Sequence, residues 1–304
     1  MDEIRRRRQI RHRQEQRRRA AIRRRNALLC AAVASAVIGV VIGSGAGRGP
    51  GAAVKEQKTP KLARGGVGPP TAGGKLVQWK GPVPILMYHV IDNAPPGAQL
   101  PELYVGPTTF DQQMKALDKE GYTGVSLNQV YDAWFKGGKL PEKPVVVSFD
   151  DGYRGQYVYA RPELRKLGWP GVLDLIVQTY AEPNGELSPE MVQRMINDGW
   201  EIDSHTVHHL DVSTLSGSEL REEVAGSRKD IQQRFHQPVN FFCYPSGRYD
   251  AQAIRAVRTA GYLGATTEDQ GLASKNQMYT LRRIRVDGSD GVGGLERKLR
   301  QAGA

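Results

Sequence analysis

Cysteine is nearly absent from this 304-residue chain. Cys30 lies inside an apolar run, and Cys243 lies inside a segment predicted to be a strand. A disulfide between two such positions is not expected, which excludes a small cross-linked scaffold. The chain is long enough to bury a core of its own, and a domain of that size needs no disulfides even outside the cell.

Most of the chain has little excess positive charge, although the whole chain has a net charge of +11. Residues 1–26 hold twelve arginines against three acidic residues, so the rest of the chain carries a net charge of only +2. A basic face for nucleic acid is therefore not expected on the folded part. No aromatic residues interleave with the arginines, so nucleic-acid binding by this segment is also disfavoured.

An apolar segment, residues 27–47, follows the arginines directly. About 20 such residues span the core of a bilayer, and flanking positive charge stays on the cytoplasmic side. The order predicts a cytoplasmic tail at 1–26, a single-pass transmembrane helix at 27–47, and everything later outside the cytoplasm. The alternative is a cleaved secretory signal, which would leave the protein secreted; the long charged segment favours the anchor.

Residues 48–80 are rich in glycine, proline, lysine and alanine and contain few large apolar residues. Such a segment cannot bury enough surface to fold, so it is predicted to be a disordered, flexible linker. The remaining residues, 81–304, are predicted to form one domain.

Within this domain, strand-like and helix-like segments alternate. The expected strands are Val83–Val90, Pro144–Phe149, Gly171–Val177, Trp200–Ser204, Val239–Tyr244, Leu263–Thr266 and Ile284–Val286. Alternation of this kind predicts a parallel sheet, and about seven strands predict an α/β barrel, closed or nearly closed, with its active site at the carboxyl ends of the strands. Ser188 before Pro189 predicts a helix start, and Ser216 with Glu219 predicts a capping box.

Two adjacent carboxylates, Asp150 and Asp151, follow the second expected strand and precede Gly152. Neighbouring side chains in a regular strand point to opposite faces, but at a strand end leading into a glycine turn both can face one cavity. They would repel each other there unless a cation took one of them. The pair predicts one metal ligand and one free base, although Asp-Asp-Gly alone would indicate only an ordinary turn.

Histidines cluster after the fourth expected strand. His205 and His209 are four residues apart, a common spacing for two ligands on one turn of chain. Thr206 stands where a zincin needs glutamate, which excludes that class. Two imidazoles and one carboxylate leave positions open for water and suit zinc, with cobalt, nickel or iron as alternatives.

Two further strand ends carry candidate groups. His89 ends the first expected strand and is a candidate general acid, the alternative being a core histidine bonded to a backbone carbonyl. The turn after the fifth strand contains Pro245, which has no N–H, so the N–H of Ser246 is the candidate donor to an oxyanion. The alternative for that turn is a plain β-turn.

These clusters resemble the motifs of the polysaccharide deacetylases, carbohydrate esterase family 4 or the NodB-homology group. The resemblance is carried by residues 148–152, Ser-Phe-Asp-Asp-Gly, and by residues 205–209, His-Thr-Val-His-His. It implies a distorted (β/α) barrel in which Asp151, His205 and His209 bind the metal and Asp150 is the catalytic base.

The chain also departs from the family's pattern. Cys243 stands where the family usually has the arginine that orients the base, and no histidine follows His236 to serve as the usual acid. The pairing of Tyr88-His89 with the turn at 244–247 resembles the poly-β-1,6-N-acetylglucosamine deacetylases, in which the acid histidine comes from the first strand. The resemblance therefore implies that His89 is the acid and that the family's usual orienting partner of the base is absent.

The sequence thus predicts a metal-dependent hydrolase that removes N-acetyl groups from an amino-sugar polymer, with poly-N-acetylglucosamine as the expected substrate. Peptidoglycan, chitin-like polymers and xylan are alternative substrates. A catalytically inactive carbohydrate-binding protein is the alternative of another class, although the intact Asp-Asp pair and His pair argue against it.

Overall fold

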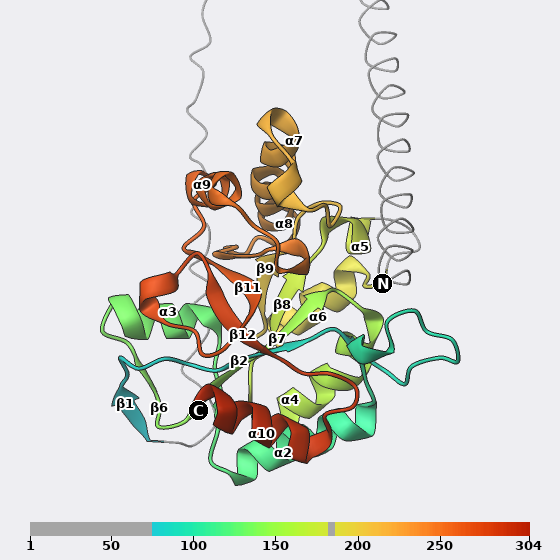
Figure 1. The fold of residues 1–304 in the computed structure, drawn as a ribbon, viewed down its shortest axis with the longest axis vertical. Helices are drawn as coiled ribbons and strands as arrows, with labels where there is room; N and C mark the ends of the chain where they lie inside the picture. Colours follow the sequence, from blue (N-terminus) through green and yellow to red (C-terminus); the bar gives the residue numbers. More distant parts are fainter. Residues whose placement is uncertain (1–74, 182–185) are drawn as a thin grey trace, which may run out of the picture. The chain divides into compact units, whose positions relative to one another are not determined.

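The computed structural model describes residues 75–181 and 186–304 (Figure 1). The predicted tail, the predicted anchor and most of the predicted linker lie outside these ranges. Within the described ranges, none of the helices combines the length and apolarity needed to cross a bilayer. Strand β1 (Leu76–Gln78) falls inside the range predicted as linker and pairs with β6 (Lys139–Pro141), so ordered chain begins before residue 81.

Seven parallel strands form a closed ring. In order around the ring they are β2 (Ile85–Tyr88), β12 (Leu281–Arg285), β11 (Gly264–Gln270), β10 (Phe241–Cys243), β9 (Glu201–Ser204), β8 (Val172–Leu175) and β7 (Pro144–Asp151). β7 pairs back to β2 and so closes the ring. The predicted barrel of about seven parallel strands is therefore confirmed.

Besides β1 and β6, three short strands lie outside the ring. β5 (Thr123–Gly124) pairs with the start of β7, and β3 (Val90–Ile91) pairs with β4 (Tyr104–Val105). The strand predicted at Val83–Val90 is thus two strands, β2 and β3, and His89 is the residue between them.

Helices surround the strands (Figure 1). The α-helices are α2 (Pro107–Lys119), α3 (Leu127–Phe135), α4 (Arg161–Leu167), α5 (Val177–Ala181), α6 (Pro189–Asn197), α7 (Gly217–Arg221), α8 (Ser227–Phe235), α9 (Ala251–Thr259) and α10 (Gly291–Ala302). Short 3-10 turns are η1 (Pro101–Leu103), η3 (Val212–Thr214), η5 (Pro245–Gly247) and η6 (Lys275–Gln277). Two π-helical turns, η2 (Gln156–Ala160) and η4 (Glu222–Gly226), run directly into α4 and α8.

The helix starts follow the sequence in part. Ser188 caps α6 by accepting the N–H of Met191, as predicted. Ser216 precedes α7 but makes no side-chain cap, so the predicted capping box is wrong there; Gly217 has a φ of 56°, which turns the first residue of the helix away from helical geometry. The capping box that does form, at the start of α3, was not predicted.

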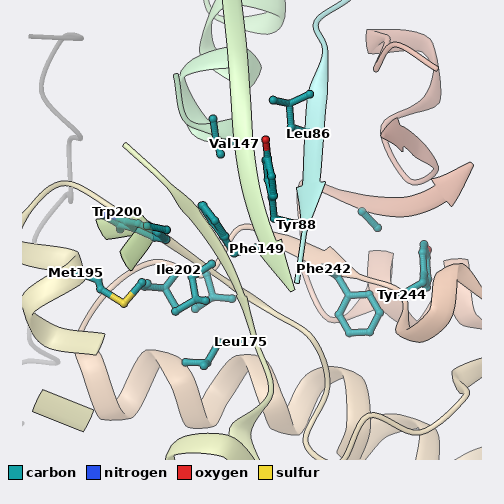
Figure 2. Packing of buried hydrophobic residues seen from close by; sticks show 14 of the residues in the cluster. Leu86, Tyr88, Val147, Phe149, Leu175, Met195, Trp200, Ile202, Phe242 and Tyr244 are labelled. Atoms are coloured by element: carbon teal, nitrogen blue, oxygen red, sulfur yellow. The ribbon is translucent and has the colours of Figure 1, made fainter. Parts of the chain in front are cut away.

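The core between the strands and the helices fixes which side chains face the inside of the barrel. Phe149 packs between Tyr88 and Trp200, with ring centroids 5.7 Å and 5.1 Å away (Figure 2). Because side chains alternate along a strand, the residues on either side of Phe149, Ser148 and Asp150, point into the barrel instead. Both are buried.

Carboxyl groups line part of the barrel interior. Asp150, Asp174 and Asp203 stand in register on the neighbouring strands β7, β8 and β9. Asp174 is fully buried, and neither of its oxygens has a hydrogen-bond partner among the described residues. Burial, and then the charge of Asp150, raise the pKa of Asp174 well above its ordinary value. Folding therefore favours the protonated form of Asp174 over the ionised form.

The raised pKa of Asp174 predicts a stability that depends on pH. A native state that keeps this proton binds one proton more than the unfolded chain, which releases it above about pH 4. The free energy of unfolding is therefore unaffected by this group below that pH and falls as pH rises, by about 1.4 kcal/mol per pH unit. Asp174→Asn keeps the neutral shape and does not titrate. We expect its free energy of unfolding, measured in urea between about pH 5 and pH 8, to fall less steeply than that of the wild type.

The matched control is Asp118→Asn, at an exposed position of α2. This variant should retain the pH dependence of the wild type. Parallel curves for Asp174→Asn and the wild type would show that Asp174 is already ionised in the native state.

Candidate active site

The predicted site residues come together at one end of the barrel. Asp150 and Asp151 are the last two residues of β7, and His205 follows the last residue of β9. His89 follows β2, and Ser246 lies in the turn after β10. All five stand at the carboxyl ends of parallel strands, where barrels of this kind place their chemistry.

The backbone at these strand ends is strained. Asp151, Thr206, His209 and Ser246 have φ values of 75°, 71°, 56° and 54°. They are four of the five non-glycine residues with positive φ in the described ranges, and such residues cost about 1–3 kcal/mol each unless the surroundings hold them. The left-handed turn at Asp151 explains how two adjacent carboxylates can both serve one site.

Asp151, His205 and His209 form a cluster of potential metal ligands. Oδ1 of Asp151 lies 3.4 Å from Nε2 of His205 and 3.5 Å from Nε2 of His209, and the two Nε2 atoms are 3.1 Å apart. Three atoms about 2.1 Å from a tetrahedral ion lie about 3.4 Å from one another. Oδ1 of Asp151 is also buried without a hydrogen-bond partner in the described structure, so the three groups fit a divalent cation.

A backbone carbonyl orients His205. Its Nδ1 lies 2.8 Å from the carbonyl oxygen of Cys243 and can only donate to it, which leaves the Nε2 lone pair facing Asp151. Burial alone would lower the pKa of His205, but Asp151 and Asp150 together raise it to about 9 in the protein without a cation.

Asp150 is held by a buried arginine that the sequence interpretation missed. Nη1 of Arg283 donates to Oδ1 of Asp150 at 2.6 Å, and Nη2 donates to Oδ2 at 2.7 Å. Burial would raise the pKa of Asp150, but the guanidinium outweighs it and holds the pKa well below its usual range. The position on β10 where the resemblance places an arginine holds Cys243, and the arginine that orients Asp150 comes from β12 instead, which the sequence did not reveal.

Cys243 leaves room for this arrangement. Its Sγ lies 3.6 Å from Oδ2 of Asp150 and 3.3 Å from Nη2 of Arg283, so a small side chain on β10 lies beside the pair.

One signal in the sequence could have revealed Arg283. Three of the five residues of β12 are arginines, and in a strand with two covered faces at least one of them must be buried and paired with a carboxylate.

His89 lies beside the base. Its Nε2 is 3.7 Å from Oδ2 of Asp150, and the side chain is buried. The backbones of the two residues are joined by Gln156, a fully buried residue of η2, whose Nε2 donates to the carbonyl of His89 at 2.8 Å and to that of Asp150 at 2.7 Å. The sequence interpretation did not single out Gln156, because nothing in its local pattern distinguishes it from a surface glutamine.

Ser246 stands in η5, at the exposed rim. In this turn the N–H of Tyr244 donates to the carbonyl of Thr266, that of Gly247 donates back to Tyr244, and Pro245 has none. In this turn the N–H of Ser246 is the remaining candidate donor to an external acceptor.

Tyr153 is a further aromatic residue of the site, because its hydroxyl responds to the charge of Asp151. Burial, and then that charge, raise the pKa of Tyr153.

Comparisons with known proteins agree with this geometry. A family model described as polysaccharide deacetylase matches residues 137–265. YxkH of Bacillus subtilis (strain 168), a protein named for that family, is 33% identical over 213 residues, which cover 70% of this chain and 73% of YxkH. Among solved structures, the Streptococcus pyogenes deacetylase PplD in complex with acetate aligns with a TM-score of 0.67 at 28% identity, over 72% of this chain and 99% of PplD.

The chain therefore belongs to the polysaccharide deacetylase family, whose members are hydrolases. Its relatives include the poly-beta-1,6-N-acetyl-D-glucosamine N-deacetylase of Escherichia coli (strain K12), which is 26% identical over 224 residues. The match covers 60% of this chain and only 33% of the E. coli protein.

The Asp150–Arg283 pair predicts the outcome of replacing the arginine. Arg283→Lys keeps the charge but cannot make two parallel hydrogen bonds to one carboxylate. We expect kcat for deacetylation to fall on the order of tenfold to a hundredfold, with zinc affinity close to that of the wild type. Turnover and zinc affinity would be measured on the same preparations.

Arg282→Lys is the matched control, because Arg282 is the exposed neighbour on β12. Its turnover should be that of the wild type. An Arg283→Lys enzyme with undiminished kcat would show that orientation of Asp150 does not limit the reaction.

Proposed function

We propose that this protein is a metal-dependent N-deacetylase of an amino-sugar polymer, with poly-N-acetylglucosamine as its substrate. The observation that carries the proposal is the grouping, at one barrel rim, of the Asp151–His205–His209 cluster with a second carboxylate held ionised by Arg283. Such a grouping provides one site for a cation and one separate base. The choice of polymer is supported by the E. coli relative and by the position of His89, which matches the branch that takes its acid from the first strand.

Each side chain has a distinct role in the proposed reaction. Asp151, His205 and His209 would hold the cation, zinc being the expected ion. A bound divalent cation supplies Lewis-acid polarisation of the acetyl carbonyl and of the attacking water. Asp150 accepts the proton of that water, and Arg283 keeps its carboxylate ionised and correctly turned.

The leaving amine needs a proton when the amide bond breaks. His89, which directly follows β2 and lies beside Asp150, donates that proton. The N–H of Ser246 donates a hydrogen bond to the developing oxyanion. These roles balance the reaction: water adds to the acetyl carbon, and acetate and a free amine leave.

We also propose that the domain works outside the cytoplasm, tethered by residues 27–47. The support is the sequence alone, an arginine-rich segment followed by an apolar stretch of bilayer length.

The activity is tested by acetate release from a chain of residues 75–304, first stripped of metal and then supplied with zinc, cobalt or nickel. The substrates are β-1,6-linked and β-1,4-linked N-acetylglucosamine oligomers. We expect metal-dependent release of acetate with preference for the β-1,6 linkage.

The role of Asp150 is tested by Asp150→Asn, which removes the carboxylate that accepts the proton of water. This variant should lower kcat by about 10²–10⁴-fold and still bind zinc.

Preference for the β-1,4 linkage would overturn the choice of polymer while retaining the deacetylase. Absence of release from every oligomer, with zinc bound, would overturn the enzyme proposal in favour of a carbohydrate-binding protein.

The role of His89 is tested by leaving-group dependence. His89→Asn should slow amide hydrolysis by about a hundredfold or more, because an amine needs a proton to depart. Hydrolysis of an activated aryl acetate, whose leaving group needs no proton, should change little. The matched control is His236→Asn, at the exposed end of α8, where asparagine tolerates the positive φ. Equal losses on both substrates would assign His89 a structural role only.

A further inference from the structure

Glu223 is a buried acidic residue for which the reaction described above has no use. It lies in the π-helical turn η4, between α7 and α8, and is only 2% exposed. A buried carboxylate is retained only where donors satisfy it. Its contacts therefore show what it does.

All the recorded partners of the Glu223 carboxylate belong to the loop that carries the two histidine ligands. Oε2 accepts the backbone N–H of Val207 at 3.0 Å and that of His208 at 2.9 Å. Oε1 lies 2.6 Å from Nδ1 of His208. Two successive amides converging on one oxygen form the concave arrangement that binds anions, here occupied by a side chain of the protein itself.

This loop needs such support because its backbone is strained at both sides of the contact. Thr206 has a φ of 71°, which is rare for a β-branched residue, and His209 has a φ of 56°. Thr206 Oγ1 accepts the N–H of His209 at 2.8 Å, which closes the turn locally. The two amides between these strained residues are the ones that Glu223 holds.

The π turn is also tied to the strand before the loop. Ser227 Oγ donates to the carbonyls of Glu223 and Val224, at 2.7 Å and 3.0 Å, and lies 2.7 Å from Oγ of Ser204. Ser204 immediately precedes His205. The turn thus holds the ligand loop from both sides, at Ser204 and at residues 207–208.

The other π turn of the described structure is built in the same way. Gln156 in η2 donates to the carbonyls of His89 and Asp150. In both turns a buried polar side chain reaches the backbone beside catalytic groups, and π turns often occur at functional sites.

From these contacts we propose that Glu223 is a positioning residue for the metal site. Its carboxylate fixes the backbone between His205 and His209, so that both Nε2 atoms face Asp151. Glu223 is not itself a ligand, because it lies outside the Asp151–His205–His209 cluster and its oxygens are engaged by the loop. This inference rests on the proposed metal site.

The test compares Glu223→Gln with Glu222→Gln, the same change at the exposed neighbouring residue. Glutamine keeps the size of the side chain but removes the charge that holds two amides. We expect the Kd for zinc, measured by competition with a chromogenic chelator, to rise 10–100-fold in Glu223→Gln and to stay within twofold in Glu222→Gln. Arg283→Lys should leave this Kd unchanged, which separates support of the metal from support of the base.

A second measurement uses metal-free protein and needs no activity. Hydrogen exchange at the amides of Val207 and His208 should be slow in the wild type and in Glu222→Gln, and faster in Glu223→Gln. Fast exchange of both amides in the wild type would overturn the proposal even if Glu223→Gln failed to fold. A folded Glu223→Gln with the wild-type Kd for zinc would overturn it too, whereas a wild type that binds no zinc would overturn the metal site itself.

Discussion

The ion pair between Asp150 and Arg283 is the interaction on which the site depends. Both side chains are buried inside the barrel, where removing two charges from water is costly unless geometry and hydrogen bonds compensate. The bidentate contact provides that compensation. The guanidinium of Arg283 lies 2.6 Å from Asp150 and 3.5 Å from Asp174, so it holds the pKa of Asp150 low while burial keeps that of Asp174 raised. This difference favours Asp150 as the carboxylate that acts as a base.

The strand ends around this pair are held by residues from the helical layer. Gln156 fixes the backbones of His89 and Asp150, and Glu223 fixes the loop between His205 and His209. Both come from π turns, in which the wider helix places a polar side chain against the barrel rim. The left-handed backbone at the rim requires these polar contacts, because residues with positive φ keep that conformation only where their surroundings stabilise it.

The sequence predicted the parts of the site that are local. A buried strand followed by Asp-Asp-Gly, and another followed by two histidines four residues apart, were enough to predict that Asp150, Asp151, His205 and His209 meet at one rim. The rule that parallel strands present their carboxyl ends together does not depend on details of packing. The catalytic roles of these residues, of His89 and of Ser246 stay predictions.

What the sequence by itself determined was the alternation of apolar strands and helices, and with it a parallel barrel with polar residues at its strand ends. What only the tertiary structure decided was the choice of partners. Arg283 is 133 positions from Asp150, and Gln156 is 67 from His89. Strand register, and the space beside Cys243, decide which of the three arginines in β12 points into the barrel. Neither can be predicted from the local sequence pattern. Periodicity reports which face of an element is buried, whereas pairing across a barrel depends on how the whole ring closes.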